Sequence, residues 1–192
     1  MSQPDQTSRR TSTVMRRLLG PNLSFLLMAW RQRRRARPEV NGPVLDEASL
    51  APGMTVLDFG CGPGYYTIPA ARRVGPSGTV IALDKLPIAA WMVRAAALRH
   101  GIRSVRTVTS DLATGLPGAS VDVVLFYDVL HHLPTPVPLL QEFHRVLKLT
   151  GLLSVSDHHM HTGDIIAAVT GGDYFAHRAT GRHTISFSPQ RR

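Results

Sequence analysis

The stretch VLDFGCGPG, residues 56–64, decides the fold class of this 192-residue chain. It opens with a mostly apolar run of strand length, continues with glycine at every second position and precedes a helical pattern. Glycine has no Cβ, so such a loop lets the backbone approach a ligand closely, and the N–H groups of the next helix point at that ligand. The stretch therefore predicts a strand, a ligand-binding loop and a helix.

Apolar runs of strand length alternate with helical patterns along the rest of the chain, which indicates a parallel sheet with helices on both faces. Residues 121–127, VDVVLFY, are almost continuously apolar, as in a strand at the middle of a sheet. We therefore expect an α/β fold: a three-layer, Rossmann-like, doubly wound, mostly parallel sheet with an antiparallel C-terminal hairpin. The expected strands are residues 55–59, 79–83, 105–109, 121–127 and 152–156, and the hairpin pairs 174–177 with 183–187.

The spacing of the glycines separates two classes of cofactor. A dinucleotide-binding loop has the pattern G-x-G-x-x-G, and its third glycine is missing whether the count starts at Gly60 or at Gly62. This argues against hydride transfer. The residues instead spell D-x-G-x-G-x-G, from Asp58 through Gly60 and Gly62 to Gly64. In this motif the chain resembles the class I S-adenosylmethionine-dependent methyltransferases, over about residues 53–156.

The resemblance implies how the first two strands hold the cofactor. In the family this loop wraps the amino acid end of S-adenosylmethionine, so Gly60 and Gly62 take a backbone role and Asp58 lies near the cofactor's ammonium group. Asp84 ends the second expected strand, where a carboxylate can accept hydrogen bonds from ribose hydroxyls.

The resemblance also assigns residues after the third and fourth strands. Asp111 would meet the exocyclic amine of adenine, Leu112 would offer a backbone N–H and Tyr127 would line the cofactor pocket. Taken alone, an Asp in such a position can equally be a turn or helix-cap residue. The expected cofactor-binding set is Asp58, Gly60, Cys61, Gly62, Gly64, Asp84, Lys85, Asp111, Leu112 and Tyr127.

The expected activity is methyl transfer by in-line displacement, in which the protein mainly aligns the reactants. Residues 126–133, FYDVLHHL, resemble the motif after the fourth strand of small-molecule methyltransferases, so we expect a small acceptor, apolar or membrane-derived in one reading. A general base is needed only if the acceptor carries a proton. His131 and His132 are the candidate catalytic residues because imidazole titrates near neutral pH, although they can also simply pack or cap the next turn.

A second group of polar residues follows the fifth expected strand, with Asp157, His158 and His159 in succession and His161 and Asp164 after them. Imidazole and carboxylate suit zinc, iron or nickel, but the spacing matches no closed metal site. We expect no metal here. These residues are expected at the mouth of the acceptor pocket instead.

The positive charge is concentrated at the N-terminus. Residues 1–40 carry nine arginines against Asp5 and Glu39, a net +7 of the chain's +9. We therefore expect a basic arm over residues 1–40 and a methyltransferase domain over 41–192. The arm can contact an anionic membrane surface or nucleic acid, or remain a solvated tail. Residues 18–50, with an expected short helix at 44–50, can also fold over the cofactor as a lid.

The cellular setting is only loosely constrained by the sequence. Cys61 is the single cysteine, which excludes an internal disulfide and a multi-cysteine zinc site. Residues 18–30 are interrupted by Gly20-Pro21-Asn22 and fall short of the roughly 20 apolar residues that span a bilayer. We expect a cytoplasmic protein without a transmembrane segment, peripheral at a membrane in one reading. Two rival functions stay open: an RNA methyltransferase guided by the arm, and a cofactor-binding protein without catalytic activity.

Overall fold

The structure, a computed structural model, describes residues 23–30 and 37–191. The described residues fall into two units, with the helix 23–30 in the first and residues 37–191 in the second. Residues 37–40, the end of the expected basic arm, belong to the second unit, and residues 1–22 and 31–36 lie outside the described residues. Among the helices of these ranges, none is long and apolar enough to cross a membrane.

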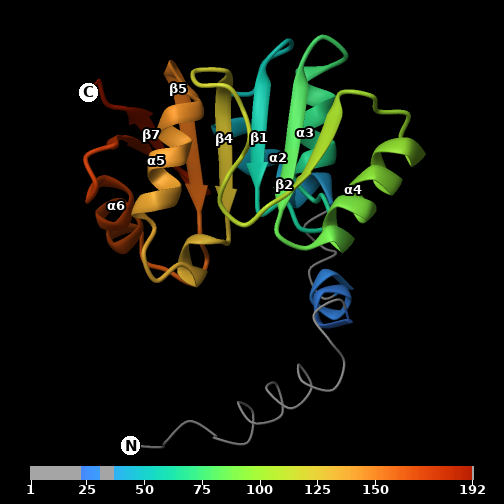
Figure 1. Cartoon of the computed structure of the whole chain (residues 1–192), viewed down its shortest axis with the longest axis horizontal. Coiled ribbons are helices and arrows are strands. Elements are labelled where there is room, and N and C mark those ends of the chain that lie inside the picture. Colours follow the sequence, from blue (N-terminus) through green and yellow to red (C-terminus); the bar gives the residue numbers. More distant parts are fainter. Residues whose placement is uncertain (1–22, 31–36, 192) are drawn as a thin grey trace, which may run out of the picture. The chain divides into compact units, whose positions relative to one another are not determined.

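The second unit is built on a seven-stranded sheet in the order β3-β2-β1-β4-β5-β7-β6 (Figure 1). Strands β1 to β5 run parallel, and β7 is antiparallel to both of its neighbours, β5 and β6. The fold expected from the sequence is thereby confirmed, including the C-terminal hairpin. The strands are β1 Thr55–Phe59, β2 Thr79–Asp84, β3 Val105–Thr109, β4 Val121–Tyr127, β5 Leu147–Ser156, β6 Phe175–Thr180 and β7 Ile185–Pro189.

Helices cover both faces of the sheet because its strands alternate their side chains between two cores. Along β4, Val123 and Leu125 pack with α2 and α3, whereas Val124 and Phe126 pack with α5 and α6. Figure 1 shows α5 in front of the sheet and α3 behind it. The helices are α2 Pro38–Glu47, α3 Thr67–Val74, α4 Pro87–Arg99, α5 Val137–Val146 and α6 Thr162–Thr170, with a 3-10 turn, η2, at Leu130–His132.

The first helix of this unit differs from its expected position. Residues 41–43, which include Gly42 and Pro43 and suggest a break, lie inside α2, so the helix expected at 44–50 instead occupies Pro38–Glu47. Tertiary contacts explain the difference. The amide Nδ2 of the buried Asn41 donates to the carbonyl of Tyr65 at 3.2 Å, and Leu45 is fully buried. These contacts outweigh the poor helix propensity of glycine and proline.

Strand β5 also starts earlier than expected, at Leu147 rather than at residue 152. Leu147 pairs with Val121, and an irregularity between Val121 and Val123 shifts the register before Leu152 pairs with Val123. Gly151 thus lies within the strand.

The reversal of strand order between β1 and β4 positions the site. β1 leads to β2 on one side, while β4 leads to β5 on the other, so the loops after β1 and β4 diverge at the carboxyl edge of the sheet. Open α/β sheets bind ligands in the crevice at such a point. Asp58, Asp84 and Tyr127 lie at or next to the carboxyl ends of their strands, and Asp111, His131 and Asp157 follow strands at the same edge.

Candidate active site

The glycine loop after β1 is held against the end of β2. The N–H groups of Gly60 and Cys61 both donate to the carbonyl of Leu83, at 2.8 and 3.0 Å. Gly60 has φ +74°, and a Cβ there would collide with the side chain of Val129. Position 60 therefore requires glycine on two independent grounds.

Gly62 faces open space. It has φ +53°, and a Cβ built on it would have only the carbonyl of Gly60 nearby, at 4.0 Å. The missing side chain thus leaves room for a ligand above the loop, as a cofactor cradle requires.

Asp84 braces this loop from the end of β2. Its Oδ2 accepts a hydrogen bond from the N–H of Gly62 at 3.0 Å, and its Oδ1 accepts one from the N–H of Leu86 at 2.9 Å. A carboxylate has about four acceptor positions, so these two bonds leave capacity for ribose hydroxyls. Asp84 therefore fits two tasks, orienting the loop and binding sugar.

Asp58 is buried beneath the loop. Its Oδ2 accepts a hydrogen bond from the hydroxyl of Thr67 at 2.5 Å. Burial raises the pKa of Asp58 to about 7, with a contribution from the charge of Asp84, while the bond from Thr67 opposes the rise. A buried carboxylate of this kind gains from a nearby cation, which suits the ammonium group of S-adenosylmethionine. Sequence reasoning missed Thr67, whose only signal is its place at the start of α3.

The remaining expected cofactor residues differ in exposure. Cys61 is buried against Ala82 and Val93, and burial raises the pKa of its thiol. Lys85 and Asp111 are exposed where they follow β2 and β3, and Leu112 is 41% exposed.

Tyr127 ends β4 on the face of the sheet that carries α3. Its hydroxyl lies 2.9 Å from the Oγ of the buried Ser154, and its ring meets the ring of Tyr66 edge-on at 4.9 Å. Burial raises the pKa of its phenol. The structure thus places Tyr127 in the core that α2 and α3 share with the sheet.

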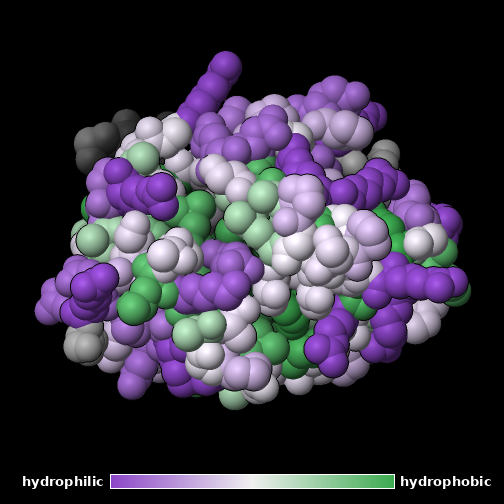
Figure 2. Space-filling model, turned by 90° about the horizontal axis from the view of Figure 1, so that it is seen from above, coloured by the Kyte–Doolittle hydropathy of each residue, from purple (hydrophilic) through white to green (hydrophobic). Residues whose placement is uncertain are grey.

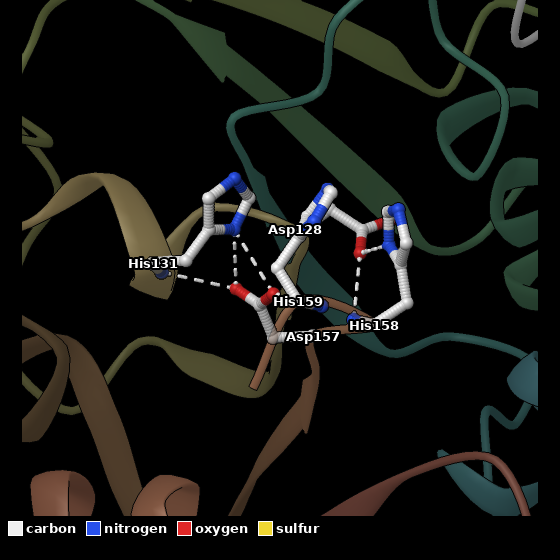
Figure 3. Close-up of polar contacts among 5 residues, drawn as sticks. All are labelled: Asp128, His131, Asp157, His158 and His159. Carbon is white, nitrogen blue, oxygen red and sulfur yellow. Dashed lines mark hydrogen bonds and ion pairs between the residues drawn. The ribbon is translucent and has the colours of Figure 1, made fainter. Parts of the chain in front are cut away.

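Two histidine–aspartate pairs lie at the carboxyl ends of β4 and β5 (Figure 3). In the first, Nδ1 of His131 lies 2.8 Å from Oδ2 of Asp157, which also accepts the backbone N–H of His131 at 3.0 Å. Oδ1 of Asp157 accepts the N–H of His159 at 3.1 Å. Burial acts to raise the pKa of Asp157, but the bonds from His131 and His159 hold it below its ordinary value.

The second pair joins Asp128 to His158, whose ring Nδ1 and backbone N–H both contact Oδ1 of Asp128. Asp128 has φ +56°, a left-handed conformation that costs a non-glycine residue energy. Between the pairs, the ring of His159 lies 4.3 Å from that of His131 and 3.9 Å from that of His158, centroid to centroid. Figure 3 shows the imidazoles side by side.

The expected catalytic pair His131 and His132 has unequal surroundings. Their ring centroids are 3.8 Å apart. Burial lowers the pKa of His132, and the charges of His131 and Lys85 lower it further. His131 has the carboxylate of Asp157 at Nδ1. An ionised Asp157 accepts the proton of Nδ1, which leaves the lone pair of the neutral imidazole on Nε2, the arrangement of a general base.

The histidines and aspartates of this cluster do not form a metal site. Within residues 23–30 and 37–191, no group of three or more His, Cys, Asp or Glu side chains is arranged to hold a metal ion. The aspartates of both pairs are engaged by histidine instead.

Comparison with known proteins decides the family. The model of a methyltransferase domain family matches residues 50–179, about two thirds of the chain. The chain belongs to this family of class I S-adenosylmethionine-dependent methyltransferases. The cofactor expected from the glycine motif is thereby confirmed as S-adenosylmethionine, and residues 50–179 are a domain of the kind found in methyltransferase enzymes.

Two O-methyltransferases are among the named relatives of this methyltransferase. The chain is 45% identical over 85 residues to a nocamycin O-methyltransferase of Saccharothrix syringae, and the match covers 42% of this chain and 29% of the relative. It is 33% identical over 132 residues to a ubiquinone biosynthesis O-methyltransferase of Pseudomonas paraeruginosa, covering 68% of this chain and 55% of the relative. The chain therefore spans about half or less of the length of these relatives.

A solved structure has the same fold as this methyltransferase. A S-adenosylmethionine-dependent methyltransferase from Aquifex aeolicus has a TM-score of 0.69 at 24% identity, covering 80% of this chain and 92% of that one.

Proposed function

We propose that this methyltransferase transfers the methyl group of S-adenosylmethionine to a hydroxyl oxygen of a small acceptor, with His131 as general base. The observation that carries the proposal is the hydrogen bond between Nδ1 of His131 and the buried carboxylate of Asp157. Two of the named relatives are O-methyltransferases, which supports oxygen as the acceptor atom.

The glycine loop and the aspartates would hold the cofactor. Asp58 would face the ammonium group, the backbone of Gly60 and Gly62 would line the amino acid end, and Asp84 would take the ribose. Asp111 and Leu112 would take the adenine, as the family resemblance implies. When bound, S-adenosylmethionine supplies an electrophilic methyl carbon on a positively charged sulfur.

His131 would then act on the acceptor. Its Nε2 would accept the proton of the acceptor hydroxyl as the acceptor oxygen takes the methyl group that S-adenosylmethionine supplies. The proton remains on the imidazole, which becomes a cation beside the carboxylate of Asp157. That carboxylate stabilises the cation and is kept ionised by its hydrogen bonds. The proton finally leaves to solvent.

Acceptor chemistry tests this proposal. A hydroxyl must lose a proton, whereas a carboxylate is already ionised at neutral pH and needs no base. Transfer of a labelled methyl group from S-adenosylmethionine should therefore be measured to a panel of small phenols and to a matched panel of benzoic acids. Methylation of phenols supports the proposal. Methylation of the acids alone, or of neither panel, contradicts it. One relative is a trans-aconitate 2-methyltransferase from an Azoarcus species, so a carboxylate acceptor is the alternative that the benzoic acids test.

We further propose that the arm contacts an anionic membrane surface, which makes the enzyme peripheral at a membrane. The helix 23–30 exposes Leu23, Leu26, Leu27 and Trp30, whose spacing places them on one helical face. Five of the next seven residues in the sequence are arginines. An exposed apolar face followed by arginines suits insertion at the boundary of an anionic bilayer. Neither an RNA methyltransferase nor a protein without catalytic activity is favoured by the relatives.

This contact is tested with vesicles. The full chain should sediment with phosphatidylcholine vesicles that contain phosphatidylglycerol, and the double variant Leu26→Ser, Leu27→Ser should sediment about tenfold less. Equal sedimentation of both proteins contradicts the contact.

A further inference from the structure

The outer face of α4 carries a second stripe of exposed apolar side chains. Pro87, Trp91, Arg94 and Leu98 follow one another at spacings of four, three and four residues, so they share one face of the helix. Trp91 is 63% exposed and Leu98 is 83% exposed, the largest exposed fraction among the large hydrophobic residues of the described ranges. The opposite face of α4 is buried through Ala89, Ala90, Val93 and Ala97.

Between Asp84 and Asp111, every Asp, Glu, Lys or Arg position is occupied by a basic residue. Residues 85–110 contain Lys85 and four arginines, at positions 94, 99, 103 and 106, and no aspartate or glutamate. All five basic side chains are exposed. Arg94 lies within the stripe, where its guanidinium donates to the hydroxyl of Thr107 on the edge strand β3 at 2.9 Å. Figure 2 shows one end of this domain from above, with long hydrophilic side chains projecting around exposed hydrophobic surface.

The side chains of the stripe distinguish between three kinds of binding partner: a second copy of the chain, a nucleic acid and an anionic bilayer. A second copy of the chain docked here about a twofold axis would bring two copies of the same basic face together, which is unfavourable. A nucleic acid would use the arginines and could stack on Trp91, but it gains nothing from the protruding aliphatic Leu98. An anionic bilayer can interact with Leu98, Trp91 and Arg94 together. Leucine inserts among acyl chains, tryptophan lies at the headgroup level and arginine binds phosphate.

We propose that the stripe of Pro87, Trp91, Arg94 and Leu98 on α4 docks on an anionic phospholipid surface. It deepens the membrane contact proposed for the arm, yet it stands on different residues and does not require that contact. α4 begins directly after Lys85 and Leu86, which follow the cofactor-binding Asp84. A membrane bound along α4 therefore lies beside the edge of the sheet that carries the site, which suits an acceptor drawn from a bilayer.

Vesicle binding of the full chain tests the proposal. The double variant Trp91→Ser, Leu98→Ser should bind vesicles of phosphatidylcholine with phosphatidylglycerol at least tenfold more weakly than the unchanged chain. Arg94→Gln should weaken binding severalfold, and only on the anionic vesicles. The matched control is Leu149→Ser, which removes a 61% exposed leucine outside the stripe and should leave binding unchanged. All variants should retain the melting temperature shift caused by S-adenosylmethionine.

The outcomes separate this inference from the arm contact. Unchanged vesicle binding of the Trp91, Leu98 variant overturns the inference, even if the Leu26, Leu27 variant loses binding. A loss in the α4 variant with no loss in the arm variant supports the inference and contradicts the arm contact. If the unchanged chain ignores vesicles but binds single-stranded RNA through these α4 residues, the lipid assignment is wrong.

Discussion

The imidazole of His131 and the carboxylate of Asp157 lie 2.8 Å apart although 26 residues separate them in the sequence. His131 follows β4 and Asp157 follows β5, and these strands are parallel neighbours, so both residues emerge at the same edge of the sheet. The Asp157 side chain has no exposed surface, while 20% of the His131 side chain is exposed. A fixed carboxylate thus orients an imidazole that can still reach a ligand.

Replacing Asp58 should stabilise the protein at high pH and weaken cofactor binding. Burial raises the pKa of Asp58 from its ordinary value of 3.8 to about 7, so the folded protein favours the protonated carboxyl. This contribution to stability is complete below the ordinary pKa and is lost as pH rises from there through about 7. Asp58→Asn removes the buried charge but keeps an acceptor for Thr67. Its free energy of unfolding should exceed that of the unchanged protein by about 1 to 3 kcal/mol at pH 8, and this difference should be clearly smaller at pH 5. Urea denaturation at the two pH values measures this.

The same variant should show a smaller melting temperature shift with S-adenosylmethionine, because the ammonium group loses its counter-charge. An Asn variant that is less stable than the unchanged protein at pH 8, or that keeps the full shift, would refute the role given to Asp58.

Gly60→Ala and Gly62→Ala should fail in different ways. At position 60 a methyl group meets Val129, so Gly60→Ala should lose about 1 to 3 kcal/mol of stability, and Val129→Ala in the same chain should restore part of it. At position 62 the space is open and only the positive φ is penalised, by about 1 to 2 kcal/mol. Gly62→Ala should nevertheless bind S-adenosylmethionine at least tenfold more weakly, as calorimetry can measure. Unchanged affinity would mean that the open side of Gly62 does not face the cofactor.

Glu47 should contribute strongly to stability. Its carboxylate, at the end of α2, accepts the backbone N–H groups of Arg182, His183 and Thr184, the last at 2.7 Å. Burial acts to raise the pKa of Glu47, but these bonds lower it overall, so the stabilisation is present at neutral pH and is lost as pH falls through the lowered value.

Glu47→Gln should therefore cost about 1 to 3 kcal/mol at pH 7 by urea denaturation. Glu39→Gln, on the same helix but exposed, is the control and should change stability by less than about 1 kcal/mol. Equal effects of the two substitutions would show that the contact with the β6–β7 turn has no special weight.

The sequence predicts what depends on local pattern. β1, β3 and β4 begin and end where the sequence predicts, because each lies between polar or glycine-rich loops. β1 and β4 are mostly apolar runs, and β3, VRTVT, is rich in β-branched residues. The positions of Asp58 and Asp84 at strand ends follow from the same pattern. The position predicted for α2 was wrong because local propensity opposes a helix at Gly42 and Pro43, whereas the burial of neighbouring residues favours it.

Contacts between distant residues explain what the sequence leaves open. The bond between Glu47 and Thr184 spans 137 residues and exists only once the hairpin has joined the sheet. The sequence places His131 and Asp157 at one edge, but it cannot tell which of the neighbouring histidines faces the carboxylate. The roles assigned to the site residues remain predictions for experiment.

The pH dependence of methyl transfer in His131→Gln tests the central claim most directly, with the phenol that the unchanged enzyme methylates fastest as acceptor. The variant should be about 10²- to 10⁴-fold slower near pH 7 with its affinity for S-adenosylmethionine unchanged, and His177→Gln should be as fast as the unchanged enzyme. Its rate should then rise about tenfold per pH unit towards the phenol's own pKa, near 10, since an ionised phenol needs no base. A His131→Gln enzyme that equals the unchanged enzyme at pH 7, or whose slow rate stays flat as pH rises, contradicts the assignment of His131 as general base.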